Sequence, residues 1–166
     1  MTFKEQFQLW LKYERDTQIK IIESLNTVPQ THTNNEKFGK ACSLLMHIVN
    51  CRFLWLNRIG FIEEKPSDIF PKLSSITGLK EGALQSYKIW TKFFDETHES
   101  EMDFPITYRN LSGHPYTKTL YEILSHLHGH SVYHLGQINS LIRELGGKPC
   151  CADFIYWTNE QLVEEE

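Results

Sequence analysis

Residues 119–145, TLYEILSHLHGHSVYHLGQINSLIREL, carry the clearest fold signal in the chain. Thr119 and Glu122 form the capping box that opens a helix, and apolar residues then recur every three or four positions. Gly146, Gly147 and Pro149 follow, and such residues are typical of the end of a helix. The pattern predicts one long helix that ends near residue 145.

Three other segments show the same helical spacing of apolar residues. One spans residues 3–26 and ends before Pro29. A second opens at a capping box formed by residues 33–36 and runs to Gly60, and a third spans about residues 78–97. Their apolar stripes are carried by Phe7, Trp10, Leu11, Ile21, Ile22 and Leu25, by Ala41, Leu44, Ile48 and Trp55, and by Leu79, Ala83, Tyr87, Trp90 and Phe94.

The connections predict how these helices are arranged. The first connection is short, so the first two helices are expected to be antiparallel neighbours. Residues 61–77 can span the length of a helix at ~3.3 Å per residue, which lets the second and third helices run parallel. Residues 101–118 alternate like a small β-hairpin. The expected fold is therefore all-α: an up-down-down-up four-helix bundle with a long crossover between the second and third helices and a small hairpin before the fourth, as a single domain over residues 1–166.

Composition excludes several classes of protein. The 166 residues suit one domain, and a hydrophobic content of 40% supports a sizeable core. Seventeen basic and 21 acidic side chains give a formal charge of −4, which offers no basic surface for a nucleic acid. The N-terminus has no secretion signal, and we expect no membrane-spanning segment. We therefore expect a cytoplasmic protein whose partner is a small molecule, not a nucleic acid or a membrane.

The four cysteines, Cys42, Cys51, Cys150 and Cys151, are expected to be reduced. A chain of this size without a secretion signal does not need disulfides, and the adjacent Cys150 and Cys151 cannot easily bridge each other. We expect most of them to act as small apolar side chains in the core.

Histidine is the unusual component, with eight in the chain and four of them between His126 and His134. Residues four apart on a helix face the same way, so His130 and His134 can place two imidazoles on one metal ion. His134 falls near the middle of the core face of its helix and His130 on the flank of that face. His126 lies at the margin, and His128 is expected to point away from the core. Two ligands do not make a site, so a third must come from another helix.

His47 is the best candidate for the third ligand, because it lies midway along the helix over 36–60, at the edge of the apolar stripe. Cys51, one turn later, is an alternative thiolate ligand, although a buried cysteine is usually inert. Each histidine alone could be an ordinary core residue with satisfied hydrogen bonds. The combination of His47 with His130 and His134 favours a metal site.

Two further polar residues are candidates for roles beside the metal. Glu14 occupies the centre of the apolar stripe of the first helix and is expected to lie opposite His47, where it could orient a ligand or act as a general base. A plain ion pair with Arg58 or Arg143 is the alternative. Gln137, one turn after His134, could donate a hydrogen bond near the metal.

Other features of the sequence predict how the site is enclosed. Gly129 and Gly136 each cost about 1 kcal/mol relative to Ala inside a helix, which suggests close approach by a neighbouring helix or a ligand. Helix packing alone would explain them equally well. Aromatic residues are expected to wall the pocket, namely Trp10, Trp55, Trp90 and Tyr133.

The pattern His126-x3-His130-x3-His134-x-Gly136-Gln137, with His47 and Asp153-Phe-Ile-Tyr156, resembles the DinB/YfiT-like superfamily of metalloenzymes. The resemblance covers nearly the whole chain in element order, and the HxxxHxGQ segment is its most specific part. It implies a four-helix bundle with a long crossover and a divalent ion, zinc or nickel above all, bound by His47, His130 and His134. Leu135 stands where many members carry arginine, which argues against a charge-dependent substrate contact there.

The resemblance also implies a homodimer and an activity. Characterised branches of the superfamily are thiol-dependent transferases and isomerases that use bacillithiol, mycothiol or glutathione, and its name reflects DNA-damage induction, not DNA binding. We therefore expect a metal-dependent S-transferase that takes a low-molecular-weight thiol as co-substrate. Three neutral imidazoles leave an ion with an open position, as catalytic sites require. Glu14 and Gln137 would assist by proton handling or orientation.

Two other functions remain open: a metal-dependent hydrolase and a non-catalytic, stress-linked metal-binding module. A ferritin-like di-iron bundle is disfavoured, because it needs Glu-x-x-His pairs on two helices and this sequence contains none. The His-Glu-x-x-His motif of zinc proteases is also missing from the sequence.

Overall fold

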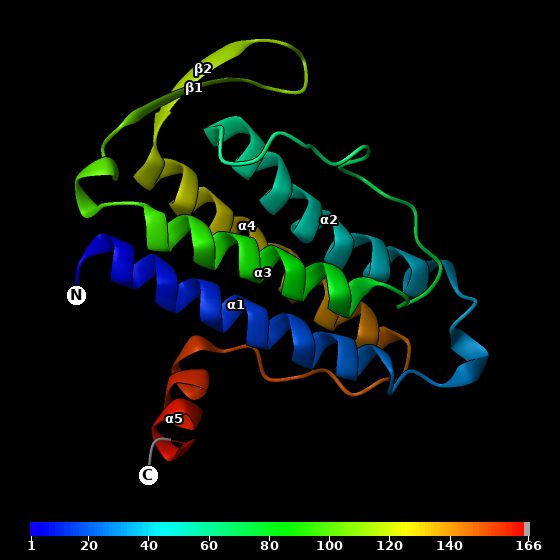
Figure 1. Cartoon of the computed structure of the whole chain (residues 1–166). Coiled ribbons are helices and arrows are strands. Elements are labelled where there is room, and N and C mark those ends of the chain that lie inside the picture. The colour runs from blue at the N-terminus through cyan, green and yellow to red at the C-terminus, as the bar shows by residue number, and fades with distance from the viewer. Residues whose placement is uncertain (165–166) are drawn as a thin grey trace.

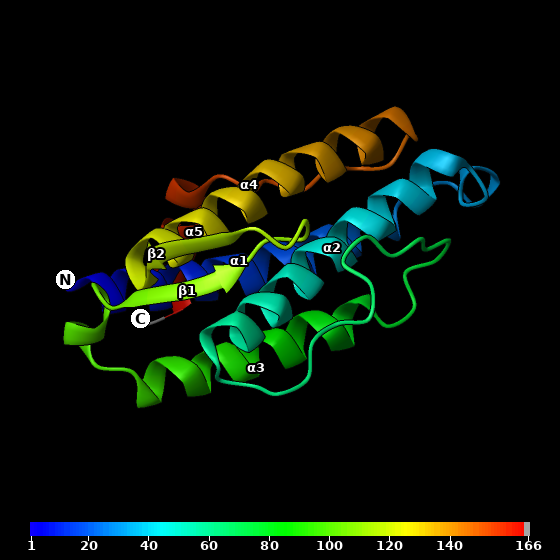
Figure 2. The ribbon, with the colours of Figure 1, turned by 90° about the horizontal axis from the view of Figure 1, so that it is seen from above.

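A computed structural model describes residues 1–164, with side chains through residue 160. Four long helices form the bundle: α1 (Phe3–Leu25), α2 (Glu36–Ile59), α3 (Leu79–Glu96) and α4 (Leu120–Glu144) (Figure 1). α1 and α4 run in one direction and α2 and α3 in the other, and the chain returns along the bundle between α2 and α3 (Figure 2). The expected up-down-down-up bundle with its long crossover is confirmed. No helix within residues 1–164 is long and apolar enough to cross a membrane.

α1 and α2 are not side-by-side neighbours, and this part of the expectation was wrong. α1 packs on α3 and α4, and α2 also packs on α3 and α4, so α1 and α2 lie on one diagonal of the bundle. The connection over residues 26–35 contains a short 3-10 helix, η1 (Gln30–His32), and is long enough to cross the end of the bundle. A short connection alone therefore does not require the helices that it joins to be adjacent.

The helix ends follow from local capping chemistry. The capping box of Thr119 and Glu122 is formed at the start of α4 as expected. The box expected at residues 33–36 is not formed, because α2 starts slightly later, where Asn35 caps the backbone N–H of Lys37. Gly60 ends α2 with a φ of 87°, a backbone conformation that favours glycine.

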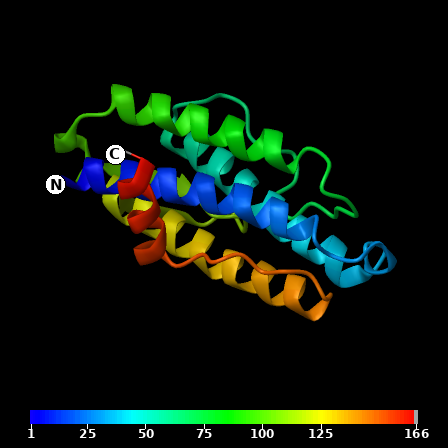
Figure 3. The same cartoon turned by 90° about the horizontal axis from the view of Figure 1, so that it is seen from below.

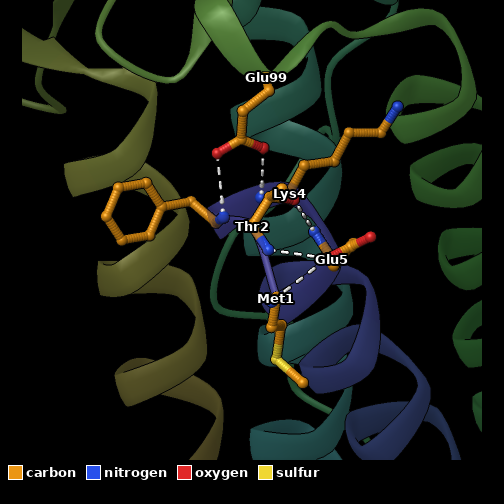
Figure 4. A network of polar contacts seen from close by, with 6 residues as sticks. Met1, Thr2, Lys4, Glu5 and Glu99 are labelled. Carbon is orange, nitrogen blue, oxygen red and sulfur yellow. Dashed lines mark hydrogen bonds and ion pairs between the residues drawn. The ribbon is translucent and has the colours of Figure 1, made fainter.

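The start of α1 is attached to the segment that follows α3 (Figure 4). A second short 3-10 helix, η2 (Glu99–Glu101), places the carboxylate of Glu99 in front of the first turn of α1. Oε1 of Glu99 accepts a hydrogen bond from the backbone N–H of Phe3, and Oε2 accepts one from the backbone N–H of Lys4, both at 2.9 Å. Thr2 and Glu5 close a capping box at the same end. These contacts satisfy N–H groups that would otherwise lack a partner at a helix start.

The expected hairpin is present and consists of β1 (Pro105–Arg109) and β2 (Pro115–Thr119), paired antiparallel with Thr107 opposite Thr117. An additional helix, α5 (Phe154–Glu164), lies across α1 (Figure 3) and was not expected from the sequence. The indole N–H of Trp157 in α5 donates to Asp16 of α1 at 3.0 Å.

A buried polar layer divides the core into two apolar clusters. One cluster contains Ile21, Leu45 and Ile138, and the other contains Phe7, Trp90 and Leu127. Buried polar residues separate the clusters on each of the four long helices: Glu14, Thr17 and Gln18 on α1, His47 and Arg52 on α2, Ser86 on α3, and Ser131 on α4. Polar side chains inside a bundle lower stability unless they are paired, so this layer is where the chemistry of the molecule is expected.

Candidate metal centre

Three histidines from two helices converge between α2 and α4. His47 comes from the middle of α2, and His130 and His134 come from α4, one turn apart. One ring nitrogen from each residue lies within 4.8 Å of the others. His47 is buried, and the other two are half-buried. The structure therefore brings together the three histidines that the sequence predicted as metal ligands.

The crossover fixes the orientation of His47. Its Nδ1 lies 2.6 Å from the carbonyl oxygen of Ile69, and a carbonyl can only accept, so Nδ1 carries the proton. Nε2 is then left with a free lone pair that can bind a metal. The ring of Phe70 stacks on the imidazole with a centroid separation of 4.6 Å, which further restricts its rotation.

Gln137 has the corresponding effect on His134. The Nδ1 atom of His134 lies 2.8 Å from Oε1 of Gln137, and with that oxygen as acceptor the imidazole carries its proton on Nδ1. Nε2 of His134 is again free to bind a metal. The sequence-based prediction had Gln137 as a donor near the metal. In the structure it accepts a hydrogen bond from His134, a candidate ligand, and restrains that ring.

The spacing and protonation of the histidines suit a divalent cation. The Nε2 atoms of His47 and His130 are 3.1 Å apart, and two nitrogens bound to one tetrahedral ion would be separated by about 3.4 Å. Burial, with His134 and His47 nearby, lowers the pKa of His130 to about 4. Burial also lowers the pKa of His47. Both rings are therefore neutral at pH 7, as metal ligands must be.

A cavity of about 690 Å³ opens beside the histidines. His47 and His134 line one end of it. The rest is formed by residues 33–35 before α2, by the N-terminal half of α2 and by the crossover, with Phe70 and Leu73 as apolar walls. Its volume is in the range of small-molecule sites. The aromatic wall expected from Trp10, Trp55, Trp90 and Tyr133 was wrong for this cavity, because none of the four lines it.

Glu14 forms an ion pair, although not with the expected arginines. Its carboxylate accepts hydrogen bonds from Nε and Nη2 of Arg52 and from Gln18, and both charged side chains are buried. Glu14 therefore lies opposite Arg52 and not opposite His47. The turn lies near residues 30 and 31 as expected, but counting outward from it assumes that α1 and α2 are neighbours, and they lie on a diagonal of the bundle. A catalytic role for Glu14 stays a prediction.

Two expectations for α4 are corrected. His128 does not point toward solvent; its ring stacks on Trp10 with a centroid separation of 4.2 Å, and its Nδ1 is buried without a hydrogen-bond partner among the described residues. α1 covers this flank of α4, which the sequence pattern of α4 alone did not show. Side chains added at Gly129 and Gly136 would meet nothing within 4 Å, so no neighbouring element of the described chain approaches these glycines.

Cys51 and His126 lie beside the centre but do not complete it. The Sγ atom of Cys51 is 3.6 Å from Nε2 of His47, and burial raises the pKa of this thiol to about 11, so the thiol is protonated at neutral pH. The His126 ring is 5.7 Å from that of His130, measured between centroids. Among the described residues, the group with metal-ligand spacing consists of His47, His130 and His134.

Two residues that support the site were not expected from the sequence. Ile69 acts through its backbone carbonyl and Phe70 through its ring, and both lie in the crossover. A backbone acceptor leaves no residue-type signal in a sequence, because any amino acid can supply it. The apolar run Ile69-Phe70-Pro71, between Asp68 and Lys72, was the available hint that part of the crossover is fixed against the bundle.

Comparison with known proteins places the chain in a family. The family model described as the DinB family matches residues 1–165. The crystal structure of a DinB-like protein from Bacillus cereus ATCC 10987 superposes with a TM-score of 0.67 at 18% sequence identity, covering 89% of this chain and 95% of that one. No curated protein matches the chain.

Proposed function

The chain belongs to the DinB family, and from that premise we propose that it is a metal-dependent enzyme whose divalent ion is bound by His47, His130 and His134. The observation that carries the proposal is the fixed protonation of the ligands. Two of the three imidazoles donate from Nδ1 to an oxygen of the protein, which leaves Nε2 unprotonated where the rings converge. An ordinary core histidine also satisfies its ring N–H, so what favours a metal is that the free nitrogens of separate helices converge.

The donor set further suggests the kind of site. Within residues 1–160 the convergent ligands are three imidazole nitrogens without a carboxylate or a thiolate, and zinc and nickel both suit imidazole ligands. Three protein ligands leave a position open for substrate, which distinguishes a catalytic site from a closed structural one. The adjoining cavity, at about 690 Å³, gives a small molecule access to that position.

We propose that the reaction is the transfer of a low-molecular-weight thiol to an electrophile. The bound ion would supply Lewis acidity, which lowers the pKa of a thiol or of water beside it. His47 and His134 present Nε2 in a fixed direction, and Ile69 and Gln137 hold those two rings in place. Phe70 and Leu73 give the adjoining cavity two apolar walls for the apolar part of a substrate, beside polar side chains such as Lys40.

We also propose that the protein is a homodimer that associates through the outer face of α4. Val132 and Tyr133 are exposed on this face by 43% and 64%. Gly129 and Gly136 flank them, and space is free beside both glycines. A second copy could therefore pack closely there. Light scattering of the wild-type protein and of a Val132→Glu variant would test this, and a monomeric wild-type protein would contradict it.

The metal is tested first. Purified protein is expected to contain about one divalent ion per chain by elemental mass spectrometry. The His134→Ala variant should lose tight binding while its helix content stays at the wild-type level. Unchanged stoichiometry in this variant would show that the ion binds elsewhere.

The thiol is tested by replacing the ion with Co(II) and titrating glutathione or cysteine into the protein. A thiolate-to-cobalt charge-transfer band would support a thiol transferase. Metal binding without any response to thiols, combined with ester or amide hydrolysis, would instead support the hydrolase. Metal binding with neither response would support the non-catalytic module.

A further inference from the structure

The cavity beside the candidate metal centre is lined by two lysines as well as by histidines. Lys40 of α2 and Lys72 of the crossover both line it, together with His47 and His134. Lys40 precedes His47 by two turns of α2, so the two side chains lie on the same face of the helix, about 10 Å apart along its axis. The cavity therefore extends from the imidazoles to a positively charged part of its wall.

Lys72 reaches the same part of the cavity from the opposite side. The crossover runs back along α2, because Phe70 stacks on His47 and the backbone N–H of Leu73 donates to Oγ of Ser43, one turn before His47, at 2.8 Å. Lys72 directly precedes Leu73, so its backbone lies near the level of Ser43, between Lys40 and His47 along α2. Two separate elements thus each contribute one ammonium group.

The positive charge of the two lysines is not compensated within the described part of the chain. The ion pairs found there involve neither Lys40 nor Lys72. Of the described residues that line the cavity, only Glu36 is acidic, and it lies in the first turn of α2, where a carboxylate interacts favourably with the positive end of the helix. The lining therefore has an excess of positive charge before any ion binds to the histidines.

We propose that Lys40 and Lys72 are specificity-determining residues, which select a substrate that carries a carboxylate at the end remote from its reacting group. An ammonium group binds a carboxylate through charge-assisted hydrogen bonds. Leu44 and Phe70 contribute apolar walls between the two ends of the cavity, against which the middle of an elongated molecule can pack. The inference rests on the proposed function, under which the reacting group is the thiol sulfur at the open position of the ion.

The first test measures the preference for an anion without using a thiol. The acid 4-(4-fluorophenyl)butanoate and its uncharged match, 4-(4-fluorophenyl)butan-1-ol, are titrated into the protein as purified, with ¹⁹F NMR as the readout. We expect wild-type protein to bind the acid about 5- to 10-fold more tightly, the size expected of two solvent-exposed ion pairs. Lys40→Met combined with Lys72→Met should remove this preference by weakening the acid alone.

The matched control is Lys80→Met combined with Lys88→Met. It removes the same charge from an exposed face of α3, and neither of these lysines lines the cavity. This control should keep the preference for the acid. Equal binding of acid and alcohol by wild-type protein would overturn the proposal. A preference that survives the Lys40 and Lys72 substitutions would also overturn it, because the acid would then be bound by another group, such as the metal itself.

The second test connects the lysines to the metal. Co(II)-substituted protein is titrated with 6-mercaptohexanoate and with 6-mercaptohexan-1-ol, and the thiolate-to-cobalt band is followed. Wild-type protein should be half-saturated at an acid concentration about 5- to 10-fold lower than that of the alcohol, and the double variant of Lys40 and Lys72 at equal concentrations. Equal half-saturation in wild-type protein would overturn the proposal and leave thiol binding intact. A band with neither thiol would instead contradict the proposed thiol transfer, while the ¹⁹F titrations still decide whether the lysines bind a carboxylate.

Discussion

The hydrogen bond between His134 and Gln137 gives a test of the metal site that leaves every ligand in place. Gln137→Leu removes the acceptor of Nδ1 and frees the ring to rotate or to change tautomer. We expect metal affinity to fall about 10- to 100-fold, as is usual when the partner of a ligating histidine is lost. Gln137→Glu keeps an acceptor and should bind metal nearly as well as wild type. Competition with a chromophoric chelator measures both, and equal affinity of the leucine variant would show that Gln137 does not orient His134.

The buried ion pair of Glu14 and Arg52 gives a second prediction about single residues, this time for stability. Both side chains are at most 6% exposed, so removing one partner leaves the other charge without compensation. Glu14→Gln should lower the free energy of unfolding by about 3–5 kcal/mol in urea titrations. The double variant Glu14→Leu with Arg52→Leu should be more stable than the single variant. If the double variant were less stable than the single variant, the loss in Glu14→Gln would not come from an uncompensated buried charge.

The spacing of residues along the sequence predicted which side chains are candidate ligands, but it did not predict what surrounds the polar residues. His130 and His134 were identified because two residues four apart on a helix share a face, and that rule depends only on helical geometry. The predicted partner of Glu14 was wrong because the prediction assumed that α1 and α2 are neighbours, whereas they lie on a diagonal of the bundle. The predicted exposure of His128 to solvent was wrong because the surroundings of this residue depend on a neighbouring helix. Contacts between elements need the arrangement of elements, which spacing within one helix does not contain.

At the scale of elements, the crossover and α2 meet at a glycine. A Cβ at Gly39 would lie 2.7 Å from the carbonyl oxygen of Leu73, a distance that side chains do not tolerate. Gly39→Ala should therefore displace the crossover, lower the free energy of unfolding by about 1–3 kcal/mol, and weaken metal binding, because Ile69 of the same segment orients His47.

Gly82 of α3 provides the matched control for Gly39. A Cβ there would make ordinary contacts of 3.5 Å with Met46 and Val49. Gly82→Ala should be neutral or stabilise the protein by up to about 1 kcal/mol, since Ala is the better helix former. Thermal unfolding and chelator competition on both variants check the prediction. It fails if the two substitutions have the same effect.

The contact of Glu99 with α1 predicts a pH dependence of stability. Backbone hydrogen bonds from Lys4 and then Phe3 hold the pKa of this carboxyl below its ordinary value of 4.5. A carboxyl with a depressed pKa stabilises the fold above its ordinary pKa, and this contribution is lost as the pH falls through the lower folded-state value. Glu99→Gln should therefore be less stable than wild type at pH 7, with a difference that narrows below pH 4.5.

Thermal unfolding between pH 7 and pH 3 measures that difference. Glu64→Gln, which changes an exposed acid of the crossover, serves as the control and should keep the wild-type profile. A constant gap between Glu99→Gln and wild type across this range would show that the carboxylate charge is not what binds the start of α1.

Local signals explain why the elements themselves were largely predictable. The apolar periodicities predicted the four long helices, and the capping box of Thr119 and Glu122 predicted the start of α4 to within one residue. α5 was missed because it is short and follows Pro149 and two cysteines, without a long apolar stripe of its own. It is held by tertiary contacts such as Trp157 with Asp16, and short helices of this kind depend on packing rather than on intrinsic propensity.

At the scale of the whole molecule, the candidate metal centre lies where the core is discontinuous. The two apolar clusters pack above and below the polar layer, and the four long helices each contribute polar residues to that layer. Such a layer costs stability that a continuous apolar core would not. A cation bound by His47 on α2 and His130 and His134 on α4 would cross-link two helices at that level.

Metal binding should therefore stabilise the whole bundle and not only the site. A ligand at 100 times its Kd that binds only the folded state adds about 2.7 kcal/mol, and for a chain of this size that corresponds to a rise in Tm of roughly 5–10 °C. Differential scanning calorimetry with and without Zn(II) measures the shift. His134→Ala should show little of it, whereas Cys151→Ala, which removes an exposed thiol, should show all of it. An equal shift in His134→Ala would mean that the stabilising ion binds outside the three histidines, and the cross-link between α2 and α4 would have to be abandoned.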